Sequence, residues 1–134
     1  MKGIFIAYLS SLFALLIIDG AWLSFTLKRF YAPRIGHLMA GSFQLAPVLA
    51  FYLLYTLGIT ALVVMPALRG KTALHSVFLT GAVLGAVAYG TYDLTNQATL
   101  KGWPQVITIV DLVWGTLLTG VSSAVSVYCT RVFE

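Results

Sequence analysis

Four long runs of apolar residues, each bounded by basic residues or prolines, dominate the hydrophobic pattern of the 134-residue chain. Each run has the roughly 20 residues that an α-helix needs to cross about 30 Å of hydrocarbon. Backbone groups in lipid must be satisfied within a segment, and the alternation typical of barrel strands is not visible here. The pattern therefore predicts an all-α, polytopic membrane protein with four transmembrane helices, at about residues 4–27, 45–65, 73–100 and 103–129.

Short links between the runs define the expected topology. Residues 66–72 and 101–102 are too few for a long crossover, so the helices that they join are antiparallel neighbours. The simplest architecture is an up-down four-helix bundle. Pro66 is expected to end the second helix, because a proline inside a helix removes a hydrogen bond. No shift in composition divides the chain, so residues 1–134 are expected to form one transmembrane domain.

The stretch between the first two runs, residues 30–44, mixes apolar and polar side chains. We expect it to lie along the membrane interface as a short amphipathic segment, or to fold over a polar site. Phe30, Tyr31 and Trp103 are expected to form an aromatic belt at this interface.

The composition agrees with this picture, because 60% of the residues are hydrophobic and 9% are charged. Soluble domains carry about 25% charged residues, so a soluble globular protein is excluded. The formal net charge of +4 is interpreted as anchoring to anionic membrane lipids, and the lack of a clustered basic face argues against a nucleic-acid partner. The positive-inside rule does not choose an orientation, although the free amine favours cytoplasmic termini. Each membrane face receives four bases: Lys2, Arg69, Lys71 and Arg131 at one, and Lys28, Arg29, Arg34 and Lys101 at the other.

Three of the four acidic residues, Asp19, Asp93 and Asp111, fall inside the apolar runs. Counted from Lys28 or Lys101, the nearest bases of one membrane face, each acid lies eight to ten residues away. At 1.5 Å per residue this places each about 12–15 Å below the same surface, near the middle of the bilayer. Three helices are thus expected to bring a carboxyl group to one depth.

Hydroxyl, amide and indole groups are expected around these acids. Tyrosines of the second run lie at a matching depth, and other polar residues share the helix face of Asp93. The pattern Asp-x-x-Trp occurs in both the first and the fourth run, which suggests a pseudo-symmetric pair. The predicted polar intramembrane site contains Asp19, Asp93, Asp111, Asn96, Tyr52, Tyr55 and Tyr89, with Trp22 and Trp114 as pocket walls.

The runs contain no lysine or arginine that would neutralise the acids. A lone carboxylate in hydrocarbon costs about 3 kcal/mol or more, which favours protonated acids, shared protons, hydrogen bonds or a bound cation. Oxygen ligands suit Mg²⁺ or Ca²⁺, but protonation meets the same cost without an ion, so neither a metal nor another cofactor is predicted. His37 and His75 fall on opposite faces, which argues against a bis-histidine haem.

Packing supplies a plainer explanation for some of these residues. Protonated acids and tyrosines also join helices by hydrogen bonds worth about 1 kcal/mol each. Three acids at one depth favour a functional site over this explanation. The spacing of Gly81 and Gly85 predicts a close helix contact, either within the chain or between two copies.

Several motifs resemble one family of bacterial membrane proteins over nearly the whole chain. They include Asp19-x-x-Trp22, Phe30-Tyr31, Phe51-Tyr52-Leu53-Leu54-Tyr55, Tyr92-Asp93-Leu94-Thr95-Asn96-Gln97, Trp103-Pro104 and Asp111-Leu112-Val113-Trp114-Gly115. The chain resembles the domain of unknown function 2177 family in these segments. The resemblance implies a small multi-pass protein of the bacterial inner membrane. Family members are often encoded near lipid-modification genes, so the resemblance also implies an association with lipids.

Three hypotheses for function follow. The first is a proton- or cation-linked protein such as a small transporter, in which the acids bind the proton and a homodimer encloses the pathway. The second is a lipid-binding or lipid-modifying membrane protein. The third is a non-catalytic accessory subunit whose acids act as interhelical glue. No nucleophile elbow, phosphate loop or metal-ligand spacing is present, so the sequence favours a protein that is not an enzyme and assigns no catalytic residue.

Overall fold

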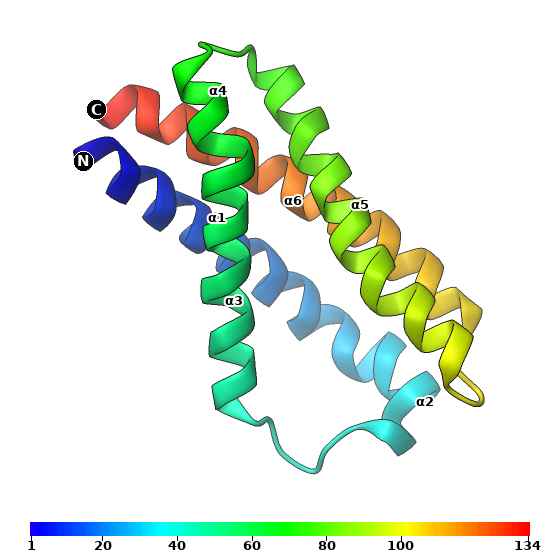
Figure 1. Cartoon of the computed structure of the whole chain (residues 1–134). Coiled ribbons are helices and arrows are strands. Elements are labelled where there is room, and N and C mark those ends of the chain that lie inside the picture. Colours follow the sequence, from blue (N-terminus) through cyan, green and yellow to red (C-terminus); the bar gives the residue numbers. More distant parts are fainter.

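A computed structural model describes residues 1–134 and is entirely helical outside the short connections. Four helical segments are long and apolar enough to cross a membrane, as the hydrophobic pattern predicts (Figure 1). The two termini lie side by side at one end of the bundle, and successive segments run up and down. The prediction of an all-α, multi-pass membrane protein is confirmed, with segments at Lys2–Leu38, Leu45–Arg69, Leu74–Thr99 and Gln105–Phe133.

The first segment extends beyond the predicted end of its helix. α1 (Lys2–Thr26) continues through a π-helical turn (Leu27–Tyr31), α2 (Ala32–Ile35) and a 3-10 turn (Gly36–Leu38). The bases that follow the apolar run are good helix formers and do not stop the helix. The wider π turn changes its direction instead, and Pro33 is tolerated in the first turn of α2. More than half of the expected interfacial stretch, residues 30–38, is therefore helical.

The second segment contains a π turn as well. α3 (Leu45–Ile59) passes through the π turn Thr60–Val64 into α4 (Met65–Arg69). The sequence predicts that Pro66 ends the helix, but the helix continues for another turn. Pro66 lies in the first turn of α4, directly after the π turn, where the ladder of i to i−4 hydrogen bonds is already interrupted.

α5 (Leu74–Thr99) and α6 (Gln105–Phe133) form a tightly packed antiparallel hairpin. A Cβ atom added to Gly81 would lie 2.5 Å from Ser123 Oγ, and one added to Gly85 would lie 2.2 Å from the Gly115 carbonyl oxygen. Only glycine permits this approach of the two backbones. The contact expected from the glycine spacing is therefore made within the chain.

α1 packs against α6 in an antiparallel register that is fixed at both ends. Ser126 Oγ donates to the Ala7 carbonyl oxygen at 2.8 Å, and Trp114 Nε1 donates to Asp19 Oδ1 at 2.9 Å. Ala7 and Asp19 are twelve residues apart on α1, and Trp114 and Ser126 are twelve residues apart on α6. Each step of four residues along α1 is therefore matched by a step of four along α6. The residues in register are Ala7 with Ser126, Ser11 with Ser122, Leu15 with Leu118, and Asp19 with Trp114.

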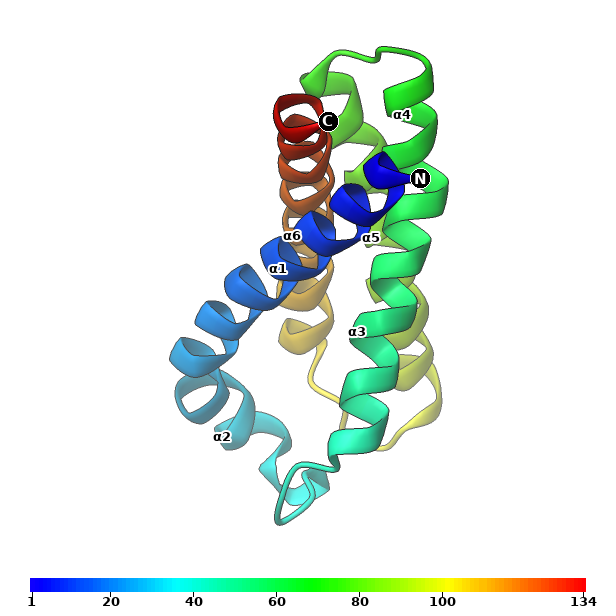
Figure 2. The same cartoon turned by 90° about the vertical axis from the view of Figure 1, so that its left-hand side faces the viewer.

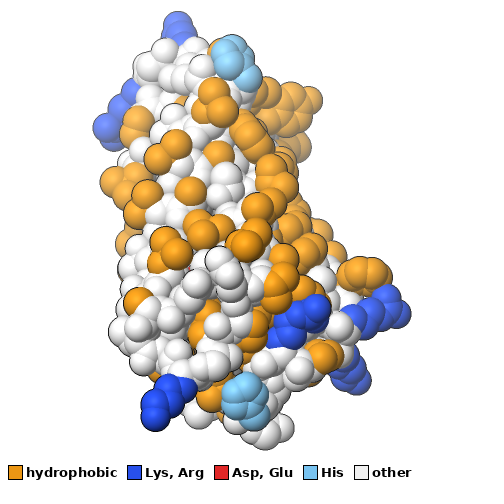
Figure 3. Space-filling model, turned by 90° about the vertical axis from the view of Figure 1, so that its right-hand side faces the viewer, with side chains coloured by type: hydrophobic (Ala, Val, Ile, Leu, Met, Phe, Trp, Pro, Cys, Tyr) orange, Lys and Arg blue, Asp and Glu red, His pale blue; other side chains and the backbone are white.

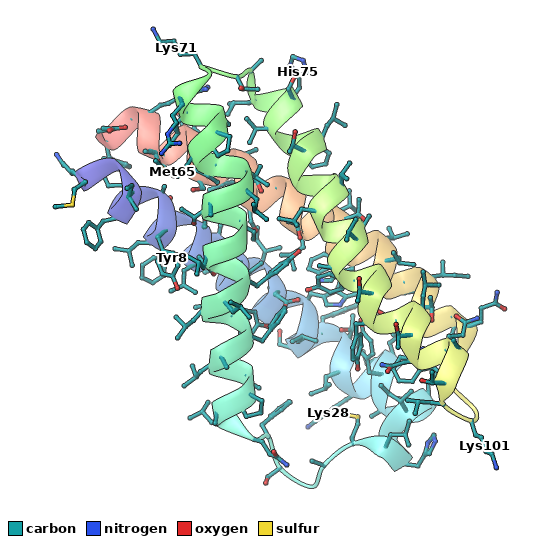
Figure 4. All side chains as sticks on the ribbon, viewed as in Figure 1. Tyr8, Lys28, Met65, Lys71, His75 and Lys101 are labelled. Carbon is teal, nitrogen blue, oxygen red and sulfur yellow. The ribbon has the colours of Figure 1, made fainter.

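The second segment divides the bundle into a packed half and a divergent half. α3 crosses α1, and the Tyr8 hydroxyl of α1 donates to the Leu53 carbonyl oxygen at 3.1 Å (Figure 4). Beyond this crossing α3 enters the core, whereas its first half separates from α1 (Figure 2). The main cluster of buried apolar side chains lies towards the termini: Ala7, Leu15, Ile59, Val63, Val64, Ala67, Val77, Leu118 and Val127.

Charged side chains gather at the two ends of the molecule. Lys71 and His75 lie at the end that carries the termini, and Lys28 and Lys101 lie at the opposite end (Figure 4). Exposed apolar side chains cover the surface between the two ends (Figure 3). This distribution is the one that a bilayer with two polar interfaces requires.

We expect Gly85→Ala to destabilise the α5–α6 hairpin by about 1–3 kcal/mol, because the new Cβ atom forces two backbones apart. Gly58→Ala is the matched control, since a Cβ atom there meets nothing within 4 Å. Its expected effect is neutral to slightly stabilising, by up to about 1 kcal/mol of helix propensity. Thermal unfolding of both variants in detergent measures the difference, and equal melting temperatures would contradict the packing described here.

Candidate functional site

The three intramembrane acids are buried in the divergent half of the bundle. Asp93 is fully buried, and Asp19 and Asp111 are exposed by only 6% and 9%. Asp19 is in register with Trp114 of α6, less than one turn from Asp111. Thr108 of α6 donates to the Asp93 carbonyl oxygen at 3.5 Å, which places the Asp93 turn of α5 beside the same part of α6. The structure thus places the three acids within about one helical turn of a common level.

Asp19 is held by hydrogen bonds to both of its carboxyl oxygens. The Tyr52 hydroxyl of α3 donates to Oδ2, and Trp114 Nε1 of α6 donates to Oδ1 at 2.9 Å. Both donors are neutral groups from other helices. Asp19 therefore joins α1, α3 and α6 at one point, which is what an interhelical anchor requires.

Asp111 accepts a hydrogen bond from Tyr31, which the sequence assigns to an interfacial aromatic belt. That prediction is wrong, because the Tyr31 side chain is buried and its hydroxyl donates to Asp111 Oδ1. The same hydroxyl accepts a hydrogen bond from Trp22 Nε1 at 3.3 Å. The sequence prediction treats the helix as straight, which leaves Tyr31 at the interface. The π turn that ends at Tyr31 redirects the chain, so the Tyr31 ring reaches the acids.

Two stacked tryptophans join the surroundings of these acids. The rings of Trp22 and Trp114 lie 4.3 Å apart between centroids, with 11° between their planes. Trp22 follows Asp19 by three residues but donates to the tyrosine that contacts Asp111. Trp114 follows Asp111 by three residues and donates to Asp19. The repeated Asp-x-x-Trp pattern therefore forms a crossed pair, in which each tryptophan serves the acid of the other helix.

Asp93 differs from the other two acids because neither of its carboxyl oxygens has a hydrogen-bond donor. It interacts with the carboxyl group of Asp111 on the neighbouring helix. Two carboxyl groups that are close together in a medium of low dielectric constant cannot both ionise without a large cost. One proton on the pair removes this cost and supplies a donor, so the arrangement is suited to holding a proton.

The other predicted residues lie near the acids without bonding to them. The Tyr55 hydroxyl is 2.6 Å from Thr119 Oγ1, on the core side of the acids. Tyr89 covers Gly115, where an added Cβ atom would lie 2.1 Å from the ring. Asn96 is half-buried and makes no hydrogen bond to a carboxyl group. No group of three His, Cys, Asp or Glu side chains is placed to bind a metal ion.

A hollow of about 720 Å³ lies beside the acids where α1 and α3 diverge. Tyr52, which binds Asp19, forms part of its wall, and several other lining side chains are exposed at the molecular surface. The hollow is therefore open at the molecular surface, and Tyr52 connects its wall to Asp19. It is lined by Leu23, Phe43, Leu45, Pro47, Val48, Phe51, Tyr52 and Tyr92.

The four spans and the buried acids define a multi-pass helical membrane protein with polar groups inside its bundle. The family model described as "Predicted membrane protein (DUF2177)" matches residues 4–128, so the chain belongs to this family, as its motifs predict. Comparisons with curated proteins and with solved structures find no match.

The Tyr31 contact has a measurable consequence. Tyr31→Phe removes the donor to Asp111 and the acceptor for Trp22, so we expect a loss of about 1–3 kcal/mol in the free energy of unfolding. Tyr128→Phe is the control, because Tyr128 is 58% exposed and makes no hydrogen bond through its hydroxyl. Thermal unfolding in detergent measures both variants. A residue of an aromatic belt would tolerate the change, so equal stability of the two variants would refute the Tyr31–Asp111 contact.

Proposed function

We propose that the protein is a small proton-linked membrane protein, as in a small transporter, whose proton is held by the Asp93–Asp111 pair. The observation that supports this proposal is the complete burial of Asp93 without any donor to its carboxyl oxygens. A group of this kind is costly in a membrane, and ionisable residues inside transporters serve as proton relays.

The three acids take different roles in this proposal. Asp19 already has donors from two helices and fixes the site in place. Asp111 has one neutral donor, Tyr31, and Asp93 has none. A proton on Asp93 can hydrogen-bond to Asp111, and its release leaves a pair whose repulsion is relieved only by movement or by a bound cation. Proton binding is thereby linked to the arrangement of the groups around the pair, Tyr31 among them.

Access to the acids supports the same proposal. The hollow beside Tyr52 approaches them from the divergent half, whereas the main apolar cluster packs in the half near the termini. An approach from the molecular surface is what a protonatable site inside the bundle requires. We propose that the protein lies in the bacterial inner membrane with both termini cytoplasmic. Because four helices enclose little space, we also propose that it forms a homodimer.

Infrared difference spectroscopy of the protein in liposomes tests the proton site directly. As the pH is cycled, the wild type should show a reversible C=O stretching band from a buried carboxyl group. We expect Asp93→Asn to abolish this band, because the pair then has one titrating group fewer and an amide donor in place of the proton. Glu134→Gln, which makes the same change at the exposed C-terminal residue, should leave it intact. A buried carboxyl band that survives in Asp93→Asn would rule out the proposal.

A lipid-handling function is the second candidate, and the shape of the hollow favours it. Its volume of about 720 Å³ falls within the range of about 300–1,000 Å³ that is typical of ligand pockets. Its walls are mostly apolar, while the hydroxyl group of Tyr52, which is bonded to Asp19, adds a polar group to the lining. An acyl chain with a polar headgroup has this combination of properties.

Filling the hollow distinguishes this second candidate from the first. Phe51→Trp adds bulk to a side chain that lines it, so a bound lipid should be lost from the purified protein. Leu54→Trp makes a similar addition on the lipid-facing side of α3, at a position that is 70% exposed. Native mass spectrometry in detergent should find a co-purified lipid in the wild type and in Leu54→Trp. Retention of the lipid by Phe51→Trp, or its absence from the wild type, would exclude binding in this hollow.

A further inference from the structure

Four hydroxyl groups in the core have no hydrogen-bond partner, and they belong to Ser11, Thr56, Thr60 and Ser122. All four side chains are at least 96% buried. Many other serines and threonines in this bundle bond to the carbonyl group of the preceding helical turn, and others bond to a neighbouring helix. Ser123 Oγ, for example, donates to the Thr119 carbonyl oxygen at 2.7 Å. The four unpartnered hydroxyls are therefore exceptions to the local rule.

Two of these hydroxyls, those of Ser11 and Ser122, belong to residues at one level of the α1–α6 contact. The register of that contact is fixed by Ala7 with Ser126 on one side and Asp19 with Trp114 on the other. Ser11 lies four residues beyond Ala7, and Ser122 lies four residues before Ser126. Because the two helices are antiparallel, these steps bring both residues to one level.

The other two hydroxyls come from the second segment at nearly the same depth. Thr56 and Thr60 are four residues apart and share a face, and Thr60 begins the π turn. The hydrogen bond between Tyr55 and Thr119 places this part of α3 against α6, one turn before Ser122. The hydroxyls thus converge from three helices, beside a π turn of the kind that frequently marks functional sites.

An unsatisfied buried hydroxyl group costs about 1–3 kcal/mol, so four in one place would strongly destabilise a small bundle. Buried polar groups of this kind are normally satisfied by ordered water, which needs two to four polar partners. We propose that Ser11, Thr56, Thr60 and Ser122 form a binding site for internal water, and that this water carries protons between the acids and the membrane face that bears the termini.

The position of the site fits such a route, a part of the inference that rests on the proposed proton-linked function. Ser11 lies eight residues from Asp19 on α1, which is about 12 Å along the helix axis. Between the two levels the Tyr55 and Thr119 hydroxyls are 2.6 Å apart. Beyond the water site, Ser10 Oγ and Ser126 Oγ are 3.2 Å apart. A proton that enters the water at one end releases another at the far end, so the water is unchanged.

The sign of a stability change tests the water site independently of any proton movement. Thr56→Val and Ser122→Ala remove a hydroxyl with little change in volume. If water occupies the site, each variant strips it of a partner, and the melting temperature in detergent should fall. If the site is dry, each variant removes an unsatisfied group, so a rise in melting temperature would overturn the inference. Ser123→Ala is the matched control, since its hydroxyl bonds within its own helix.

The rate of proton transfer tests the route. After a pH jump, the infrared band of the buried carboxyl group should develop about tenfold more slowly in the double variant Thr56→Val/Thr60→Val than in the wild type. This slowing is expected because the loss of one hydrogen bond along the water route raises the barrier to proton transfer. The final amplitude should be unchanged, and Ser123→Ala should behave like the wild type. An unchanged rate in the double variant would overturn the route. A wild type without any titrating buried band would instead refute the proposed function, while the melting temperatures would still decide whether water is bound.

Discussion

The cost of an uncompensated carboxyl group inside a bilayer is the constraint on which this structure depends. No lysine or arginine of the chain lies near the acids, so neutral donors have to supply the compensation. Each donor reaches its acid from a different part of the chain: Tyr52 from α3, Trp114 from α6, and Tyr31 from the end of the π turn in the first segment. The same bonds fix how the helices meet. The acids therefore organise the divergent half, where apolar side chains pack less closely.

The packed half follows a different rule, because its helices approach through small residues. A Cβ atom on Gly85 would lie 2.2 Å from the backbone of α6, and Ser126 Oγ donates to the backbone of α1 at 2.8 Å. Such close approach compensates for the weak hydrophobic driving force between helices in lipid. It also explains why so much of the buried face of α6 is small or hydroxylated. The bundle is held by backbone proximity at one end and by side-chain hydrogen bonds at the other.

The sequence predicts the number, type and order of the membrane-spanning helices, because span length and the positions of bases depend only on bilayer thickness. It also indicates Tyr52 and both Asp-x-x-Trp tryptophans as neighbours of the acids, since regular helices make depth easy to count. Tyr31 is missed because a π turn breaks this count. No residue pattern in the sequence distinguishes the two π turns, and Lys28-Arg29 is more simply interpreted as a helix end. The unpartnered hydroxyls are equally hidden, because Ser11 and Ser122 meet only through the register of distant helices.

The location of the acids in the divergent half has a mechanical consequence. Tyr31, which contacts Asp111, is the last residue of a π turn, and α2 and the connection to α3 follow directly. That connection, from Met39 to Gln44, lines a second hollow of about 440 Å³ together with Leu27 and the start of α3. A change in charge at Asp111 would therefore act on Tyr31, which lies where the π turn sets the direction of the chain. The α5–α6 hairpin, held by backbone contact at Gly85, offers a rigid surface against which such a movement is made. The glycine contacts keep Asp93 and Asp111 together, and under the proposed proton-linked function the Tyr31 contact determines which part of the chain responds to their proton.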